Sequence, residues 1–202
     1  MIKRHFFSFS IVLLLGTVGF ILYDTYCGYR ELSQSVQESE AVQAKKYIEN
    51  SAARIEATKF TPLKFDEKDK ILIKMGETDN IYLKGFSYKE DTHRWTEGDK
   101  AQIIFPLKAE KFKYLDVEID GNFFVKTQSV AVLINGEKVV AHFRGSSKPP
   151  YTFKIYPDQI QDGLVDITFA IKDAISPNAL GISEDTRQIA FLVKTIKITK
   201  VD

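Results

Sequence analysis

Hydrophobic and polar positions divide this chain of 202 residues into three parts. An uncharged apolar run covers residues 6–23, a polar stretch follows as far as about residue 60, and short apolar runs separated by turn residues fill the remainder. A helix over residues 6–23 would be about 27 Å long, close to the hydrocarbon thickness of a bilayer. The pattern predicts a transmembrane helix within residues 1–28, a helical stalk over 29–60 and one folded domain over 61–202.

Charges on either side of the apolar run predict its orientation. Lys3 and Arg4 precede the run, whereas Asp24 follows it. Because cytoplasmic flanks carry the excess of Lys and Arg, the N-terminus is predicted to be cytoplasmic and the domain to lie outside. A cleaved signal peptide ends in small residues, but this run ends in Tyr23 and Asp24, which favours a retained signal anchor. A cytoplasmic domain is the alternative.

The stalk is rich in Glu, Gln, Ala, Lys and Ser and contains no Pro, which predicts a helix. Its spacing also resembles a heptad repeat, at Ala41, Lys45, Ile48, Ala52 and Ile55. Only two heptads match, and two of the core positions are Ala, so a solvated helix beside the domain is favoured. Self-association through the stalk is the alternative.

After Pro62, short runs of β-branched and aromatic residues alternate with turn signals, which is typical of an all-β domain. Nine strands are expected, at Ile71–Met75, Ile81–Lys84, Ala101–Leu107, Tyr114–Ile119, Ser129–Ile134, Lys138–Phe143, Tyr151–Ile155, Leu164–Ile171 and Gln188–Ile198, the last with a possible break. Asn135-Gly136 predicts a tight hairpin, and His93, Arg94 and Trp95 are expected in a polar loop. The predicted fold is an antiparallel two-sheet β-sandwich, jelly-roll-like, preceded by the transmembrane helix and the stalk.

The candidate chemistry of the chain is sparse. A formal charge of +1 gives no electrostatic footprint for nucleic acid, and the single Cys27 excludes an intrachain disulfide. Neither His93 nor His142 has partners at metal-ligand spacing, so no metal or cofactor is predicted, although acidic loops leave a structural calcium open. The run from Gly181 to Asp185 lacks the second Gly of a nucleophile elbow. We therefore predict a protein that is not an enzyme.

Four short motifs resemble a known family. They are Gly85-Phe86-Ser87, Arg94-Trp95-Thr96, the Asn135-Gly136 turn and the closing run 176–187 (SPNALGISEDTR). In this order they are similar to a poorly characterised β-sandwich domain, like a carbohydrate-binding module, found at the C-terminal end of bacterial membrane glycosyltransferases and related cell-surface glycan proteins. The resemblance covers about residues 70–202 and implies a periplasmic domain on the bacterial inner membrane. Since the chain has no glycosyltransferase region, such an enzyme would be a separate partner.

The closing run 176–187 has two interpretations. As a structural corner, Pro177 fixes the loop, Gly181 permits a turn and Asp185 pairs with Arg187 or caps backbone amides. As a sugar site, an aromatic platform would stack on a pyranose ring while polar side chains bind its hydroxyls. The candidate ligands are Trp95, Arg94, Asn178, Asp185 and Arg187.

Two functions follow from these patterns. The first is a non-catalytic, membrane-anchored extracytoplasmic module that binds carbohydrate or assists a glycan assembly enzyme. The alternative is a structural or protein-interaction subunit of an envelope complex, which would carry an apolar patch on the stalk or on a sheet edge.

Overall fold

The computed structural model describes residues 39–45, 47–108, 111–136 and 138–202. The predicted transmembrane segment, residues 6–23, lies outside the described residues and stays a prediction. In the described part of the chain, no helix is both long and apolar enough to cross a membrane. The chain separates into two compact units, residues 1–51 and 52–202.

One helix covers the described residues 39–45 and 47–57, as the stalk composition predicts. In the unit that begins at residue 52, the last turns of this helix pack on the domain: Ala53 and Ala57 are buried with Ile104 and Leu164. Small alanine side chains allow a helix to approach a sheet closely. The helix end therefore covers part of one sheet's outer face, while Ile55 remains 66% exposed.

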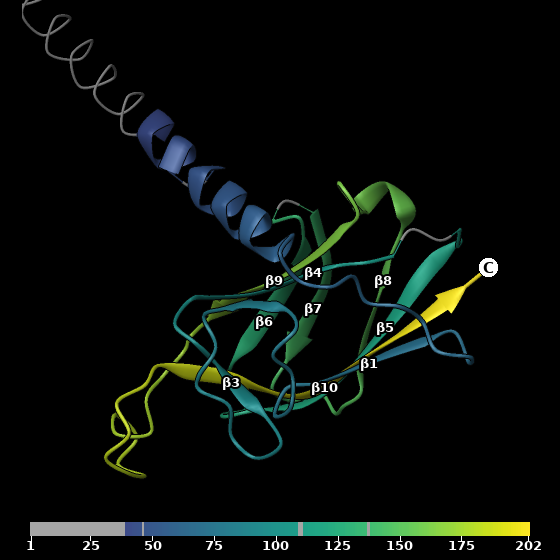
Figure 1. The fold of residues 1–202 in the computed structure, drawn as a ribbon. Coiled ribbons are helices and arrows are strands. Elements are labelled where there is room, and N and C mark those ends of the chain that lie inside the picture. The colour runs from purple at the N-terminus through teal and green to yellow at the C-terminus, as the bar shows by residue number, and fades with distance from the viewer. Residues whose placement is uncertain (1–38, 46, 109–110, 137) are drawn as a thin grey trace, which may run out of the picture. The chain divides into compact units, whose positions relative to one another are not determined.

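In the described residues, ten strands form two antiparallel sheets of five strands each, which confirms the predicted two-sheet architecture. The first sheet has the order β1-β10-β5-β8 with β3 paired to β10, and the second has the order β2-β4-β9-β6-β7 (Figure 1). The strands are β1 (Lys70–Lys74), β2 (Tyr82–Lys84), β3 (Arg94–Glu97), β4 (Lys100–Pro106), β5 (Tyr114–Phe123), β6 (Ser129–Ile134), β7 (Lys138–Arg144), β8 (Tyr151–Ile155), β9 (Leu164–Lys172) and β10 (Ile189–Val201). A short 3₁₀ helix, η1 (Pro157–Gln159), precedes β9.

All nine expected strands are present, with ends displaced by up to four residues. The tenth, β3, was predicted as a polar loop, and that prediction was wrong. Trp95 pairs with Leu192 of β10 in this strand, and Thr96 is fully buried. β3 has only four residues, one of them aromatic, and this pattern is too short to be recognised as the alternation of a strand. Its strand conformation comes from its pairing with β10. The hairpin prediction is confirmed, because Asn135 and Gly136 have φ values of 56° and 70°.

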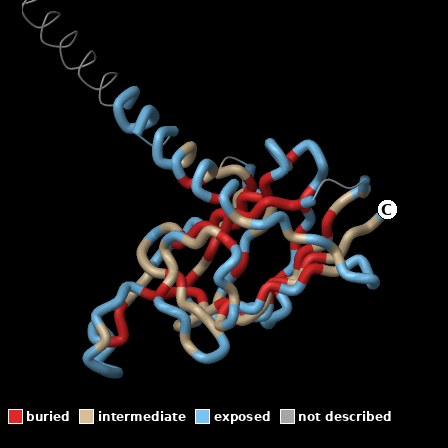
Figure 2. Tube along the Cα trace, in the orientation of Figure 1, coloured by how far each residue is buried: buried red, intermediate tan, exposed pale blue. Residues whose placement is uncertain are grey.

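The core lies between the two sheets. On β5, Leu115, Val117 and Ile119 are buried, and the residues between them are more exposed, as expected. On β9, however, Leu164, Asp166 and Thr168 on the opposite face are also buried. Figure 2 shows buried residues in the strands near the end of the helix, where Ala53 and Ala57 pack on Ile104 and Leu164. Because β9 is a central strand that is covered on both faces, its alternate residues are buried, whereas those of a half-buried strand are exposed.

The last strand has an irregularity rather than a break. β10 runs continuously from Ile189 to Val201, but its register with β5 shifts between Val193 and Thr195, which makes Lys194 the extra residue of a β-bulge. Opposite the bulge, a Cβ on Gly121 would lie 2.2 Å from the Leu192 carbonyl oxygen. Glycine therefore permits the close approach of these two strands.

Candidate functional site

β3 carries an outward-facing row of side chains at one end of the sandwich. Period-2 alternation places Trp95 and Glu97 on one side of the strand and turns Thr96 into the core, where its Oγ1 accepts a hydrogen bond of 3.0 Å from the Phe191 amide. Trp95 is partly buried and makes an edge-to-face contact with Phe124, with ring centroids 5.8 Å apart. His93 makes a similar contact with Trp95 at 6.1 Å. The indole is thus held between two rings without being fully covered.

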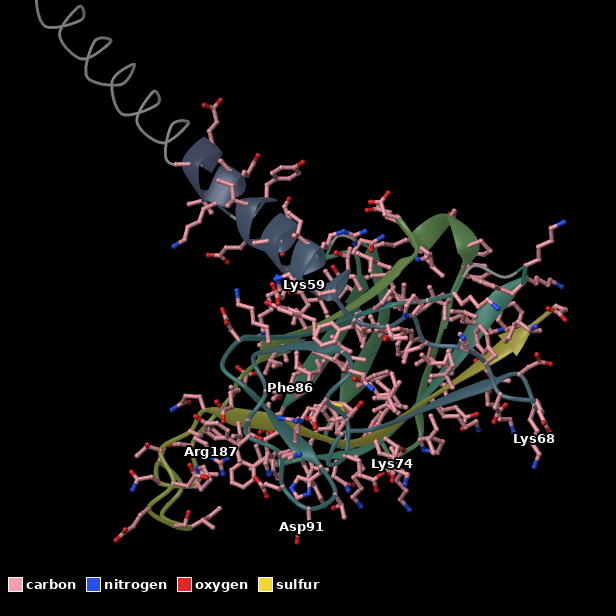
Figure 3. The ribbon with its side chains drawn as sticks, in the orientation of Figure 1. Lys59, Lys68, Lys74, Phe86, Asp91 and Arg187 are labelled. Carbon is pink, nitrogen blue, oxygen red and sulfur yellow. The ribbon has the colours of Figure 1, made fainter. Side chains whose placement is uncertain are left out.

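Arg187 connects this row to the loop that precedes β10. Its Nε donates to both carboxylate oxygens of Asp185 at 3.0 Å, and its Nη2 donates to Oδ2 at 2.6 Å. The remaining nitrogen, Nη1, lies 3.7 Å from a Glu90 oxygen and 3.9 Å from a Glu97 oxygen. Figure 3 shows Arg187 where the loop returns to the sandwich. We call Glu90, Trp95, Glu97, Asp185 and Arg187 the Arg187 face.

Charge on the Arg187 face is unbalanced. Hydrogen bonds from Arg187 hold the pKa of the Asp185 carboxyl below its usual range, and the same pair raises the pKa of Arg187. One guanidinium therefore faces three carboxylates, those of Asp185, Glu90 and Glu97. His93 Nε2 lies 3.1 Å from the second Glu90 oxygen. At neutral pH the face is net negative.

The closing loop forms the predicted corner. The Asn178 amide donates to the Asp185 carbonyl at 2.8 Å, and the Gly181 and Ile182 amides donate to the carbonyls of Asn178 and Pro177. Gly181 has a φ of +67°, a conformation that favours glycine. The expected pairing of Asp185 with Arg187 is present, and Asp185 also accepts a bond from the Arg187 amide. These bonds position Arg187 on the Arg187 face.

The five predicted ligands do not all reach one place. Asp185 and Arg187 pair directly, and Trp95 lies on the same side of β3 as Glu97, which is 3.9 Å from Arg187. Asn178 joins the Arg187 face through its backbone bond to Asp185. Arg94 alternates to the other side of β3, where Nε donates to the Met75 carbonyl at 3.0 Å and Nη1 to the Ser87 carbonyl at 3.2 Å. Arg94 thus ties two loop segments to β3. A sugar-binding role for any of the five stays a prediction.

Sequence reasoning missed Glu90, His93 and Glu97. The available signal was that His93, Trp95 and Glu97 are two residues apart from one another. This spacing places side chains on one face only if the segment is a strand, which the sequence did not indicate. Nothing in the sequence pairs Glu90 with Arg187, which lies 97 positions further along the chain. Among the described residues, no group of three or more His, Cys, Asp or Glu could hold a metal ion.

Comparison with known proteins adds little to this description. No family model and no curated protein matches the chain. Similar solved structures include the GH26-CBM35 β-(1,4)-mannanase of Podospora anserina, with 11% identity, a TM-score of 0.40 and coverage of 67% of this chain and 28% of the mannanase. The C-terminal CBM6 of a laminarinase from Zobellia galactanivorans has 12% identity, a TM-score of 0.36 and coverage of 65% and 99%. A carbohydrate-binding module CBM36 in complex with calcium and xylotriose has 13% identity, a TM-score of 0.37 and coverage of 64% and 99%.

Strand pairing defines the class of this chain, which is an all-β protein with two antiparallel five-stranded sheets in its described residues.

Proposed function

We propose that this protein is a non-catalytic carbohydrate-binding module that residues 6–23 anchor to the bacterial inner membrane, with its domain in the periplasm. It would present glycan to an assembly enzyme, such as a glycosyltransferase, carried by another chain. The observation that supports sugar binding is the position of Arg187 Nη1, 3.7 and 3.9 Å from two carboxylates on a face that also holds the partly exposed Trp95.

These distances are longer than direct hydrogen bonds, which rarely exceed about 3.2 Å. A hydroxyl group beside either pair, about 2.8–2.9 Å from both Nη1 and the carboxylate oxygen, would accept from the guanidinium and donate to the carboxylate. Water can occupy the same position in the free protein. The geometry therefore suits a ligand with several hydroxyl groups. The net negative charge favours neutral sugars over acidic ones.

Trp95 supplies the apolar part of the interaction. Indole rings combine a large apolar surface with a polar N–H group, which makes them effective where a ligand is half apolar, as a pyranose ring is. Because the Trp95 ring packs edge-to-face against Phe124 and His93, little side-chain freedom remains to be lost on binding.

The first experiment determines topology and binding together. A reporter that is active only outside the cytoplasm, fused after Asp202, should be active. The full chain, purified in a detergent without a sugar headgroup, should bind neutral glycans on an array. Trp95→Ala and Glu97→Gln should each weaken that binding, whereas the exposed Asp158→Asn control should not. A cytoplasmic C-terminus, or an array with no signal for the wild-type chain, would refute the proposal.

The alternative function, an interaction subunit of an envelope complex, is favoured by exposed apolar side chains. Val42, Tyr47, Ile48 and Ile55 on the helix are 65–75% exposed, and Val139 on the edge strand β7 is 47% exposed. Such residues would be covered in a complex. Light scattering on the purified full chain tests the version based on stalk self-association. A dimer that Ile48→Glu and Ile55→Glu dissociate, together with a blank glycan array, would support this alternative.

A further inference from the structure

A polar hollow lies on the outer side of the first sheet, and none of the residues of the Arg187 face lines it. Its volume is about 290 Å³. The lining comes from the end of β1 and the segment after it, from the loop before β3 and from neighbouring positions of β5 and β10: Lys74, Gly76, Glu77, Asp91, Thr92, Asp120, Lys194 and Thr195. Figure 3 labels Lys74 and Asp91 along this side of the sandwich.

Two features of the backbone shape the hollow. A Cβ on Gly76 would lie 2.5 Å from the Asp91 carbonyl oxygen, so only glycine lets the segment after β1 approach the loop before β3 this closely. The bulge in β10 places Lys194 in the lining, and the Lys194 carbonyl accepts a bond of 2.9 Å from the Met75 amide. A β-bulge bends its strand and changes the direction of a side chain.

The charges in the hollow are only partly paired. Lys74 forms an ion pair with Glu77 at 3.0 Å. In the described part of the chain, Asp91, Asp120 and Lys194 form no ion pair, although all three line the same space. The Lys194 ammonium therefore lies more than 4 Å from the carboxylate oxygens of Asp91 and Asp120, and the hollow offers it as a donor and the two carboxylates as acceptors. The two Thr hydroxyls of the lining can both donate and accept.

We propose that this hollow is a second sugar subsite, one that takes a single neutral pyranose ring through hydrogen bonds alone. This subsite depends on the proposed function, because it would be a second binding site for the same class of ligand. The volume is near the lower end of the roughly 300–1,000 Å³ range of ligand pockets, which suits one ring rather than a chain of rings. No aromatic residue lines the hollow, so hydroxyl groups and not stacking provide the recognition. Three carboxylates against two ammonium groups disfavour an acidic sugar.

Nuclear magnetic resonance on the full chain, isotope-labelled in a detergent without a sugar headgroup, tests this subsite. The probes are the methyl glycosides of glucose, galactose and mannose, with glucuronate as the acidic comparison. At least one neutral glycoside should shift the backbone amide signals of Gly76, Thr92 and Thr195. Asp120→Asn and Lys194→Met should each weaken that binding about tenfold, the loss expected for one hydrogen bond to a charged group.

Two controls separate this subsite from the Arg187 face. Trp95→Ala should leave the sugar-induced shifts at Gly76 and Thr195 unchanged, and Asp158→Asn should leave the affinity unchanged. Sugar-induced shifts confined to the surroundings of Trp95 would overturn the subsite while leaving the proposed function intact. Equal or tighter binding of glucuronate in the hollow would overturn its neutral specificity. An absence of sugar-induced shifts anywhere in the domain would overturn both proposals.

Discussion

Replacement of Arg54 by Met should destabilise the domain more than any exposed charge substitution. Arg54 is in the last turns of the helix, and its side chain is only 18% exposed. Nη1 donates to Asn135 Oδ1 at 3.2 Å, and Nη2 donates to the Gln161 carbonyl at 2.8 Å. Nη1 also lies 3.8 Å from Asp166, a carboxylate whose side chain is 3% exposed.

The expected loss in free energy of unfolding follows from the hydrogen bonds that Arg54→Met removes and from the buried Asp166 carboxylate that it leaves unpaired. Two hydrogen bonds from a charged donor contribute about 1.5–3 kcal/mol each, and breaking a buried ion pair by removing one partner costs about 3–5 kcal/mol. These terms overlap, and the Met side chain keeps much of the packing of the Arg stem. We therefore expect a loss of about 3 kcal/mol. In a domain of this size, that corresponds to a decrease in Tm of about 6–12 °C.

Thermal unfolding of the full chain, followed by circular dichroism at neutral pH, measures this loss. Lys59→Met is the matched control, because Lys59 pairs with Glu56 on the exposed surface of the same chain segment and should change Tm by less than about 2 °C. In an Asp166→Asn background, Arg54→Met should cost clearly less, since no buried charge remains. An Arg54→Met Tm equal to that of the control, or an equal cost in both backgrounds, would refute the reasoning.

Three further predictions follow from single contacts. Burial raises the pKa of Asp166 in the folded state. The stability of the wild-type chain relative to Asp166→Asn should therefore be greatest below the unfolded pKa of about 3.9, and this advantage should be lost as pH rises through the folded pKa. Tm measured as a function of pH tests this sign. Gly121→Ala should lower Tm by at least about 5 °C in the same melting assay, because its Cβ would lie 2.2 Å from a backbone oxygen. Arg187 lowers the pKa of Asp185, so the pair stabilises the loop above a pH of about 3.9 and this contribution is lost as pH falls through the folded pKa. The protection of the Arg187 Nε proton against hydrogen exchange, measured relative to free arginine at the same pH, should therefore fall at low pH in the wild-type chain and be low at all pH values in Asp185→Asn.

Local patterns predicted most of the fold. Strands such as β5 and β6 alternate cleanly because one face of each meets the core, and the Asn135-Gly136 turn follows from the conformations these two residues tolerate. The burial of β9 on both faces was not predicted, because it depends on Ala53, Ala57 and Arg54 from a helix that lies more than 100 positions earlier in the sequence. Alanine gives little signal of burial in a polar stretch.

The candidate site was predicted only in part. Trp95 and the Asp185-Arg187 pair were identified because their residue types and local spacing are informative. Glu90 and Glu97 were not, since their relation to Arg187 comes from the pairing of β3 with β10. Arg94 stands beside Trp95 in the sequence but lies on the other side of β3, as alternation along a strand requires.

Fluorescence of Trp95 is the most direct test of sugar binding on the Arg187 face, because this residue is the only tryptophan in the chain. The full chain should be titrated with the neutral glycans that an array identifies, and its emission recorded alongside calorimetry. We predict a saturable change in emission whose midpoint matches the calorimetric affinity, and a loss of that affinity in Trp95→Ala. Calorimetric binding with unchanged emission and with wild-type affinity in Trp95→Ala would contradict the assignment of this face.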